Sequence, residues 1–190
     1  MVDSSIERVS ALAGHFSKGC FAPDDAIGVV LQEALDLTLF QIAAWPDTLS
    51  EVGNKAAEAA GAGIAPGLGK SITGSKGTLL RVEPLKFWLV GAVPSHLSPD
   101  EGSTLDLSHS RTRLRVSGSQ AVALLNRQLP IDLREESFPV GSVASSAFHH
   151  VGVTLWRSEA GYELFLPRGY ALSLWELLRE GAAQFGFEVM

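Results

Sequence analysis

The sequence predicts an α+β protein of two split β-α-β lobes, in which helices lie on one side of largely antiparallel sheets. Two observations lead to this fold class. Short segments of alternating apolar and polar residues, typical of half-buried strands, recur along the chain, and three segments of helical spacing lie between them. The expected order is strand, helix, two strands, then two strands, helix, several strands, helix and strand.

Composition places the chain among globular proteins. Its 190 residues are 46% apolar and 19% charged, which allows a substantial core in one domain or two small lobes. The net charge of −6 argues against a general nucleic-acid binder. The single cysteine, Cys20, excludes an internal disulfide and a zinc cluster of thiolates.

We expect an N-terminal arm over residues 1–25 and a single domain over 26–190, with lobes at roughly 26–98 and 99–190. The first ten residues are polar and acidic where a signal peptide would be basic and then apolar. No apolar run reaches the roughly 20 residues that span a bilayer. These features predict a soluble cytoplasmic protein without a membrane contact.

The first lobe is expected to begin with a strand from Ile27. Leu35, Leu37 and Leu39 alternate with polar residues, as the buried face of a strand does. A continuous helix over 26–44 is the alternative interpretation of this segment.

A helix is expected next, because Trp45 and Pro46 break the preceding segment. Thr48 and Glu51 have the spacing of a capping box. The alanine-rich run that follows would end at Gly61, and its small side chains would allow close packing against a sheet.

The glycine-rich loop over 61–77 contains Gly69-Lys70-Ser71, the residue types that end a phosphate-binding P-loop. The spacing does not fit, because a P-loop needs a glycine where Ile64 stands. We therefore expect a mobile connection at this place.

Two strands are expected over 78–82 and 87–90. The adjacent aromatic residues Phe87 and Trp88 would point to opposite faces of the second strand. One of the two rings then needs a separate cover, which a helix or another subunit would supply.

The stretch over 104–133 is expected to form strand, turn, strand, glycine turn and helix. Arg111, Arg113 and Arg115 share one face of its second strand, opposite an apolar face. Three arginines cannot be buried unpaired, so they face water, carboxylates of this chain or an anionic partner. They are the candidate partner or anion contacts.

The helix of this stretch is expected to open after Gly118. Ser117 and Gln120 have capping-box spacing, and apolar residues recur at helical intervals until Pro130 ends the run. A helix N-terminus beside glycine can hold an anion, although it more often caps itself.

The last third of the chain is expected to be rich in strands. Strands over 143–150 and 151–157 precede a turn at Gly161 and a further strand. Pro167 then introduces a helix whose apolar residues recur at i, i+3, i+4, i+7 and i+11, and residues 185–189 close as a short strand.

Asp106, Ser108 and His109 have the residue types of a catalytic triad. On one strand, however, Asp106 and Ser108 would share a face while His109 points the other way, and no glycine elbow exposes the serine. We expect a polar corner that hydrogen-bonds the following turn.

His149 and His150 suggest a metal site, but adjacent strand residues point to opposite faces and no carboxylate or cysteine lies at a usual ligand spacing. One histidine is expected to be buried in a hydrogen bond and the other to lie near the surface. We therefore assign no catalytic, cofactor-binding or metal-binding residue to this chain.

The segment LDLSHSRTRLRVSGSQAVALLNRQLPIDL resembles the DVSH and glycine-helix segment of glycine cleavage T protein and related aminomethyltransferases. The downstream run FPVGSVASSAFHHVGVTLWRSEAGYELFLPRGYALSLWELL is similar, more specifically, to the gamma subunit of heterotetrameric sarcosine oxidase. The resemblance covers residues from about 100 to 190, and the N-terminal half agrees in size and general layout. It implies the fold of the N-terminal part of glycine cleavage T protein.

The resemblance also implies a function: an accessory, non-catalytic gamma subunit of a flavin-dependent complex. Such a complex demethylates sarcosine oxidatively to glycine, forms hydrogen peroxide, and passes the one-carbon unit to tetrahydrofolate in another subunit. The implied partners are the alpha, beta and delta subunits, which would carry FAD, FMN, NAD and tetrahydrofolate. No cofactor is expected in this chain, which should be inactive alone.

The chain departs from its folate-using relatives at one place. Those relatives carry a Gly-Gly-x-x-Asp-Asp segment, and Val153 and Thr154 stand here in place of the acidic pair. A carboxylate there can assist proton transfer or contact the folate ring, which valine cannot do. The alternative function is a free-standing folate-binding or one-carbon-transfer protein, in which the three arginines hold a polyanionic tail.

Overall fold

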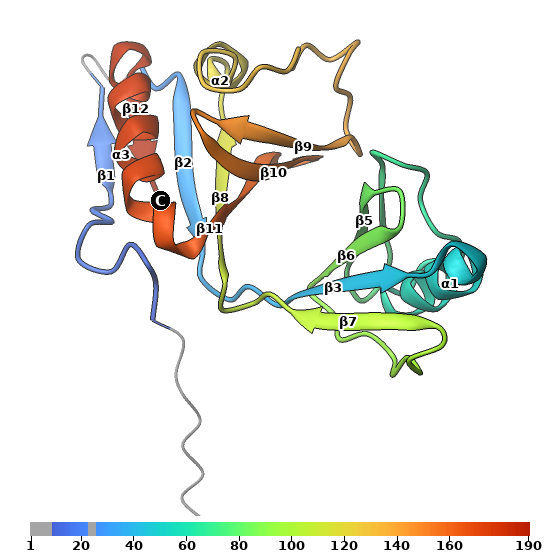
Figure 1. The fold of residues 1–190 in the computed structure, drawn as a ribbon. Helices are drawn as coiled ribbons and strands as arrows, with labels where there is room; N and C mark the ends of the chain where they lie inside the picture. Colours follow the sequence, from blue (N-terminus) through green and yellow to red (C-terminus); the bar gives the residue numbers. More distant parts are fainter. Residues whose placement is uncertain (1–8, 23–25) are drawn as a thin grey trace, which may run out of the picture.

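The computed structural model describes residues 9–22 and 26–190, which form an α+β fold of two packed sheets (Figure 1). Residues 1–8 and 23–25 of the expected N-terminal arm lie outside the described part of the chain. Both sheets are mostly antiparallel and have helices on their outer faces. The predicted fold class is therefore confirmed.

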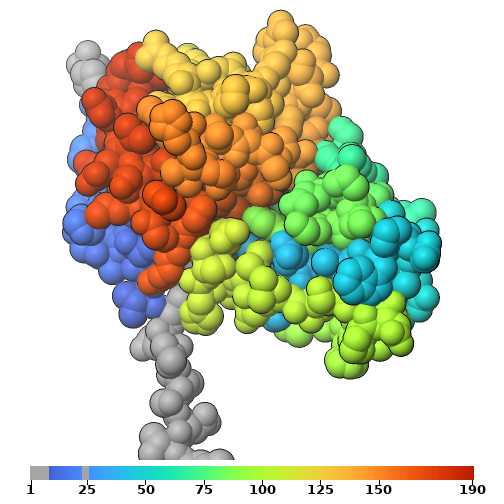
Figure 2. All heavy atoms as spheres, in the orientation of Figure 1, coloured from blue at the N-terminus to red at the C-terminus, as the bar shows by residue number. Residues whose placement is uncertain are grey.

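The larger sheet has seven strands, and within the described chain they pair antiparallel except for β12 with β2. Neighbouring strands come from both ends of the sequence, so the blue and red regions of Figure 2 lie side by side. In spatial order the strands are β1 (Gly19–Phe21), β12 (Phe187–Val189), β2 (Val29–Ala34), β8 (Arg111–Ser117), β11 (Gly161–Pro167), β10 (Val151–Ser158) and β9 (Val143–Phe148).

The smaller sheet has five strands, all paired antiparallel. Its inner face packs against the larger sheet through a shared apolar cluster, and its outer face packs against a helix. In spatial order its strands are β4 (Ser71–Thr73), β5 (Thr78–Glu83), β6 (Lys86–Val90), β3 (Leu39–Ala44) and β7 (Gly102–Asp106).

The helices cover the outer faces of the two sheets. α2 and α3 pack on the larger sheet and α1 on the smaller one (Figure 1). Among the described helices, none combines the length and the apolar character needed to cross a bilayer. Their bounds are α1 (Leu49–Ala59), α2 (Ala121–Leu125) and α3 (Ala171–Ala182), and short 3-10 turns lie at Pro46–Thr48, Arg168–Tyr170 and Ala183–Phe185.

Helix α3 is placed by the apolar stripe that its sequence predicts. Residues three and four apart lie on the same side of a helix, so the apolar residues of α3 form one face, and this face packs against the larger sheet along the length of the helix. The buried residues of the helix are Ala171, Leu174, Trp175, Leu178 and Ala182.

Two short connections carry the chain between the sheets. Residues 35–38 lead from β2 to β3, and residues 107–110 lead from β7 to β8. As a result β2 belongs to the larger sheet and β7 to the smaller one. Sheet membership therefore differs from the expected lobe boundaries of 26–98 and 99–190.

The segment over 26–44 contains two strands, so its interpretation as a continuous helix is wrong. A single strand with one buried face is not observed either, because the alternating leucines lie where the chain changes sheets. Leu35 is 60% exposed, whereas Leu37 and Leu39 are buried in the cluster between the sheets.

Neither expected capping box forms. The Thr48 hydroxyl accepts a hydrogen bond from the Trp45 N–H at 3.1 Å and donates one to the Glu101 carbonyl at 2.6 Å, while Glu51 pairs with Lys55 at 2.9 Å. Helix α2 also begins without a side-chain cap and spans only 5 residues. Tertiary contacts determine where these two helices begin.

The glycine-rich loop contains β4 and is fixed to the larger sheet, which corrects the expectation of a mobile connection. The Ser71 N–H donates to the Gly141 carbonyl at 2.8 Å, and the Val143 N–H donates to the Gly69 carbonyl at 2.8 Å. These bonds hold the two sheets together along one side.

Phe87 and Trp88 point to opposite faces of β6, as predicted. Phe87 packs in the cluster under α1, whereas Trp88 lies between the sheets with its ring edge-to-face against Phe165, at a centroid distance of 5.7 Å. The cover of Trp88 is therefore the second sheet of the same chain, in place of the expected helix or other subunit.

The described part of the expected arm packs into the fold. Leu12 is fully buried, and the Phe16 ring stacks on Trp175 with centroids 4.9 Å apart. β1 adds a strand beside β12 at the edge of the larger sheet. Residues 9–22 thus complete the core under α3.

Candidate functional site

A groove of about 500 Å³ opens between the two sheets. One wall comes from β4 and β5, where it carries hydroxyl groups. The other comes from β8, β10 and β11, where it carries charged groups and an indole. The residues that matter most for its chemistry are Ser71, Thr78, Arg113, Arg115, Trp156 and Glu163.

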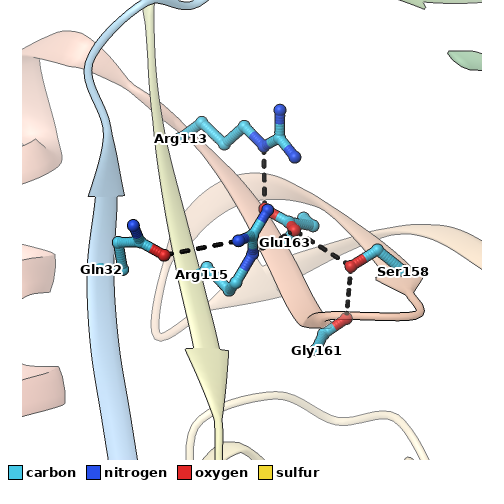
Figure 3. A network of polar contacts seen from close by, with 6 residues as sticks. All are labelled: Gln32, Arg113, Arg115, Ser158, Gly161 and Glu163. Carbon is cyan, nitrogen blue, oxygen red and sulfur yellow. Dashed lines mark hydrogen bonds and ion pairs between the residues drawn. The ribbon is translucent and has the colours of Figure 1, made fainter. Parts of the chain in front are cut away.

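Glu163 forms the centre of the charged wall. It stands opposite Arg115 in the β11–β8 register and is fully buried. Its carboxylate accepts hydrogen bonds from the Arg113 Nε at 2.8 Å, the Arg115 Nε at 2.6 Å and the Ser158 hydroxyl at 3.0 Å (Figure 3). A buried carboxylate needs such partners, because its charge is otherwise strongly destabilised.

The two arginines also decide the protonation of Glu163. Burial by itself would raise the pKa of this carboxyl, but the hydrogen bonds and positive charges of Arg113 and Arg115 outweigh it and keep the pKa below its ordinary value. Glu163 is therefore ionised at neutral pH.

Aromatic rings and an amide hold the guanidinium groups in place. Arg113 lies over the rings of Trp156 and Phe165, at 5.5 and 5.8 Å from their centroids. The Arg115 Nη1 donates to the Gln32 side-chain oxygen at 3.4 Å. Cation–π contacts of this kind orient a guanidinium while leaving its edge available for hydrogen bonds.

The predicted arginine face of β8 is observed, and its three members have different surroundings. The alternating burial of the strand places Arg111, Arg113 and Arg115 opposite its apolar face. Arg113 and Arg115 line the groove. Arg111 lies 5.8 Å from the Trp88 ring centroid, and burial lowers the pKa of its guanidinium.

Asp106 ends β7, and Ser108 and His109 lie in the second connection between the sheets. The Asp106 carboxylate accepts the Ser108 N–H at 2.8 Å, and hydrogen bonding by Ser108 lowers the pKa of Asp106. The Ser108 hydroxyl accepts the Leu39 N–H at 3.0 Å. These bonds fix the turn, and His109 is exposed beside them.

His149 and His150 form the two-residue turn between β9 and β10, and both are exposed. The prediction that one of them is buried is therefore wrong. Strand alternation does not apply here because β9 ends at Phe148 and His149 has a left-handed φ of 53°. Within 9–22 and 26–190, no group of three or more His, Cys, Asp or Glu side chains could hold a metal ion.

Sequence reasoning missed Glu163, Ser158 and the indole of Trp156 as groove residues. A signal existed for Glu163, since a single charged residue interrupts the apolar strand GYELFLP. Its partners could not be identified, because the register between β11 and β8 is not readable from the sequence. Val153 and Thr154, which were expected at the place of the acidic pair, are 4% and 6% exposed on β10.

No family model matches the sequence. Among curated proteins, the sarcosine oxidase gamma subunit of Arthrobacter sp is 27% identical over 177 residues, covering 88% of this chain and 86% of that protein. The gamma subunit of Corynebacterium sp. (strain U-96) is 27% identical over 179 residues, with the same 88% and 86% coverage. That of Corynebacterium sp. (strain P-1) is 29% identical over 121 residues, covering 59% and 60%.

Two solved structures share the fold. A chain of the heterotetrameric sarcosine oxidase from Corynebacterium sp. U-96, in complex with pyrrole 2-carboxylate, has a TM-score of 0.77 at 22% identity and covers 94% of this chain and 96% of that one. Glycine cleavage system aminomethyltransferase T from Bartonella henselae has a TM-score of 0.58 at 19% identity, covering 86% and 48%. With the sequence matches, this identifies the chain as a homologue of sarcosine oxidase gamma subunits with an aminomethyltransferase-like fold.

Proposed function

We propose that this chain is the accessory gamma subunit of a heterotetrameric, flavin-dependent sarcosine oxidase and takes no catalytic part itself. The observation that carries this proposal is the extent of the similarity to gamma subunits, which reaches 88% of this chain and 86% of two of the relatives. Similarity over nearly the whole length of both proteins favours a shared role in an assembly more than the reuse of one local motif.

In this proposal the alpha, beta and delta subunits are the partners, and the complex works in the cytoplasm. The complex demethylates sarcosine oxidatively to glycine, forms hydrogen peroxide and transfers the one-carbon unit to tetrahydrofolate. FAD, FMN, NAD and tetrahydrofolate are bound by the partner subunits. Arg111, Arg113 and Arg115 remain the candidate contacts to a partner or an anion.

The chemistry of the groove supports a non-catalytic role. A general acid or base works best when its pKa lies near the working pH. The pKa of Glu163 is moved away from neutrality, and both carboxylate oxygens already accept hydrogen bonds. Val153 and Thr154 supply no carboxylate at the position of the acidic pair in the folate-using relatives.

The alternative, a free-standing folate-binding or one-carbon-transfer protein, is favoured by one observation, the fold shared with aminomethyltransferase T. Calorimetry with tetrahydrofolate distinguishes the two proposals. We expect no heat of binding at millimolar tetrahydrofolate, and saturable binding would favour the alternative.

The accessory role is tested by purifying the full-length chain alone and after co-expression with the three larger subunits. We expect the chain alone to be colourless and unable to oxidise sarcosine, and the co-purified assembly to be coloured and active. Sarcosine oxidation by the chain alone would refute the proposal.

A further inference from the structure

We propose that the groove between the sheets binds a small organic carboxylate, held by the guanidinium groups of Arg113 and Arg115. This inference goes beyond the accessory role and does not depend on it. It rests on the charge, the geometry and the size of the groove.

The charges of the groove do not cancel. Glu163 supplies one negative charge to Arg113 and Arg115, so the buried cluster keeps one net positive charge. The side chains of Arg113 and Arg115 are only 16% and 31% exposed, which limits how well water screens that charge. A bound anion would neutralise it.

A third arginine adds to the positive charge. Arg157 also lines the groove and lies 4.3 Å from the Tyr162 ring centroid. Its ion pair with Glu135 is long, 3.8 Å, and the Glu135 side chain is 67% exposed. Glu159 lines the groove as well, but it is exposed on the turn between β10 and β11, where solvent screens its charge.

The geometry leaves donors for a second carboxylate. Arg113 and Arg115 each use Nε to bind Glu163, and among the described contacts only the Arg115 Nη1 has a further acceptor, Gln32 at 3.4 Å. Figure 3 shows a terminal nitrogen of Arg113 directed away from Glu163. A guanidinium fork binds a carboxylate through two parallel hydrogen bonds, which a planar anion fits well.

The size and the lining of the groove suit a small molecule. Its volume of about 500 Å³ lies within the roughly 300–1,000 Å³ of ordinary ligand sites. Thr73 and Thr78, whose hydroxyls hydrogen-bond each other at 3.1 Å, line it from the opposite sheet, and Ile72, Val140 and Trp156 add apolar surface. This combination favours a short carboxylic acid with a compact body over a long polyanion.

The test is a titration of the full-length chain with malonate, with acetate and inorganic phosphate as comparisons, at constant ionic strength. Calorimetry and the shift in Tm report binding. We expect saturable malonate binding with a Kd of about 1 mM or tighter, and at least tenfold weaker binding of phosphate.

Three variants locate the site. Arg113→Gln removes a proposed ligand, and Val140→Trp fills the groove from a side chain that is 49% exposed, without removing an ion pair. Both should weaken malonate binding at least tenfold. Arg127→Gln is the matched control, because this exposed arginine bonds to Gln184 away from the groove, and it should bind as the wild type does.

The proposal would be overturned by a folded wild-type chain that shows no saturable malonate binding, by undiminished binding in Val140→Trp, or by phosphate binding as tight as that of malonate. If Arg113→Gln does not fold, Val140→Trp still decides the location. Co-purification with the larger subunits is a separate result, so failure of either proposal is recognised independently.

Discussion

Glu163 holds a full negative charge inside the protein because Arg113 and Arg115 donate to it from the neighbouring strand. The position of these arginines on one face of β8 was predictable, since side chains alternate along a strand. Their partner was not predictable, because Glu163 lies 50 residues beyond Arg113 and 48 beyond Arg115 and reaches them only through the pairing of β11 with β8. Burial of the charge is therefore a tertiary property.

Replacing Glu163 with glutamine should destabilise the protein strongly. The change leaves two partly buried arginines without a counter-charge, and breaking a buried pair in this way costs about 3 kcal/mol. Urea unfolding at pH 7 measures the loss. Glu159→Gln, an exposed change on the adjacent turn, should stay within about 0.5 kcal/mol of the wild type. Equal stability of the two variants would contradict the role given to Glu163.

The contribution of Glu163 to stability should also depend on pH. Its pKa is lowered in the folded protein, so the unfolded state binds the proton more readily. The contribution is therefore complete above the unfolded pKa, about 4.3, and is lost as the pH falls through the folded pKa. The difference in unfolding free energy between the wild type and Glu163→Gln should be constant from pH 7 to about pH 5 and shrink below it. A difference in unfolding free energy that grows on acidification would contradict a lowered pKa of Glu163 in the folded protein.

At the scale of elements, the periodicity of the sequence predicted strands and helices, but the bounds of several elements in the structure differ from the predicted ones. The apolar stripe of α3 was readable because one helix face meets one sheet. The connection over 35–38 could not be predicted from the sequence, because Leu37 and Leu39 remain buried while the chain passes to the second sheet. The start of α1 depends on a hydrogen bond from Thr48 to the Glu101 carbonyl, a contact with a distant loop.

Gly118 lies in a turn that the fold can form only with glycine. It joins β8 to the segment before α2 with a φ of 104°, and a Cβ atom there would overlap the carbonyl oxygen of Gly28. We expect Gly118→Ala to destabilise the protein by at least about 2 kcal/mol in urea unfolding. Gly169→Ala is the control, because a Cβ there meets nothing within 4 Å. Similar stability of the two variants would refute this requirement.

For the whole molecule, the two sheets form one unit. Trp88 packs on Phe165 across the interface, and the Trp156 Nε1 donates to the Ser71 hydroxyl at 3.0 Å. The fold class followed from the order of elements in the sequence. The distribution of the strands between the two sheets did not follow from that order, since it depends on which distant strands pair. The groove is a consequence of this distribution, which brings β4 and β5 opposite β8, β10 and β11.

The most direct measurement is the mass of the particle that contains this chain after co-expression with the alpha, beta and delta subunits, determined by light scattering on a sizing column. We predict that the chain elutes with all three partners in equal amounts, and that omitting it changes the mass or the yield of the assembly. A stable 20.2 kDa monomer that elutes apart from an otherwise complete and active assembly would contradict the proposed role as the gamma subunit.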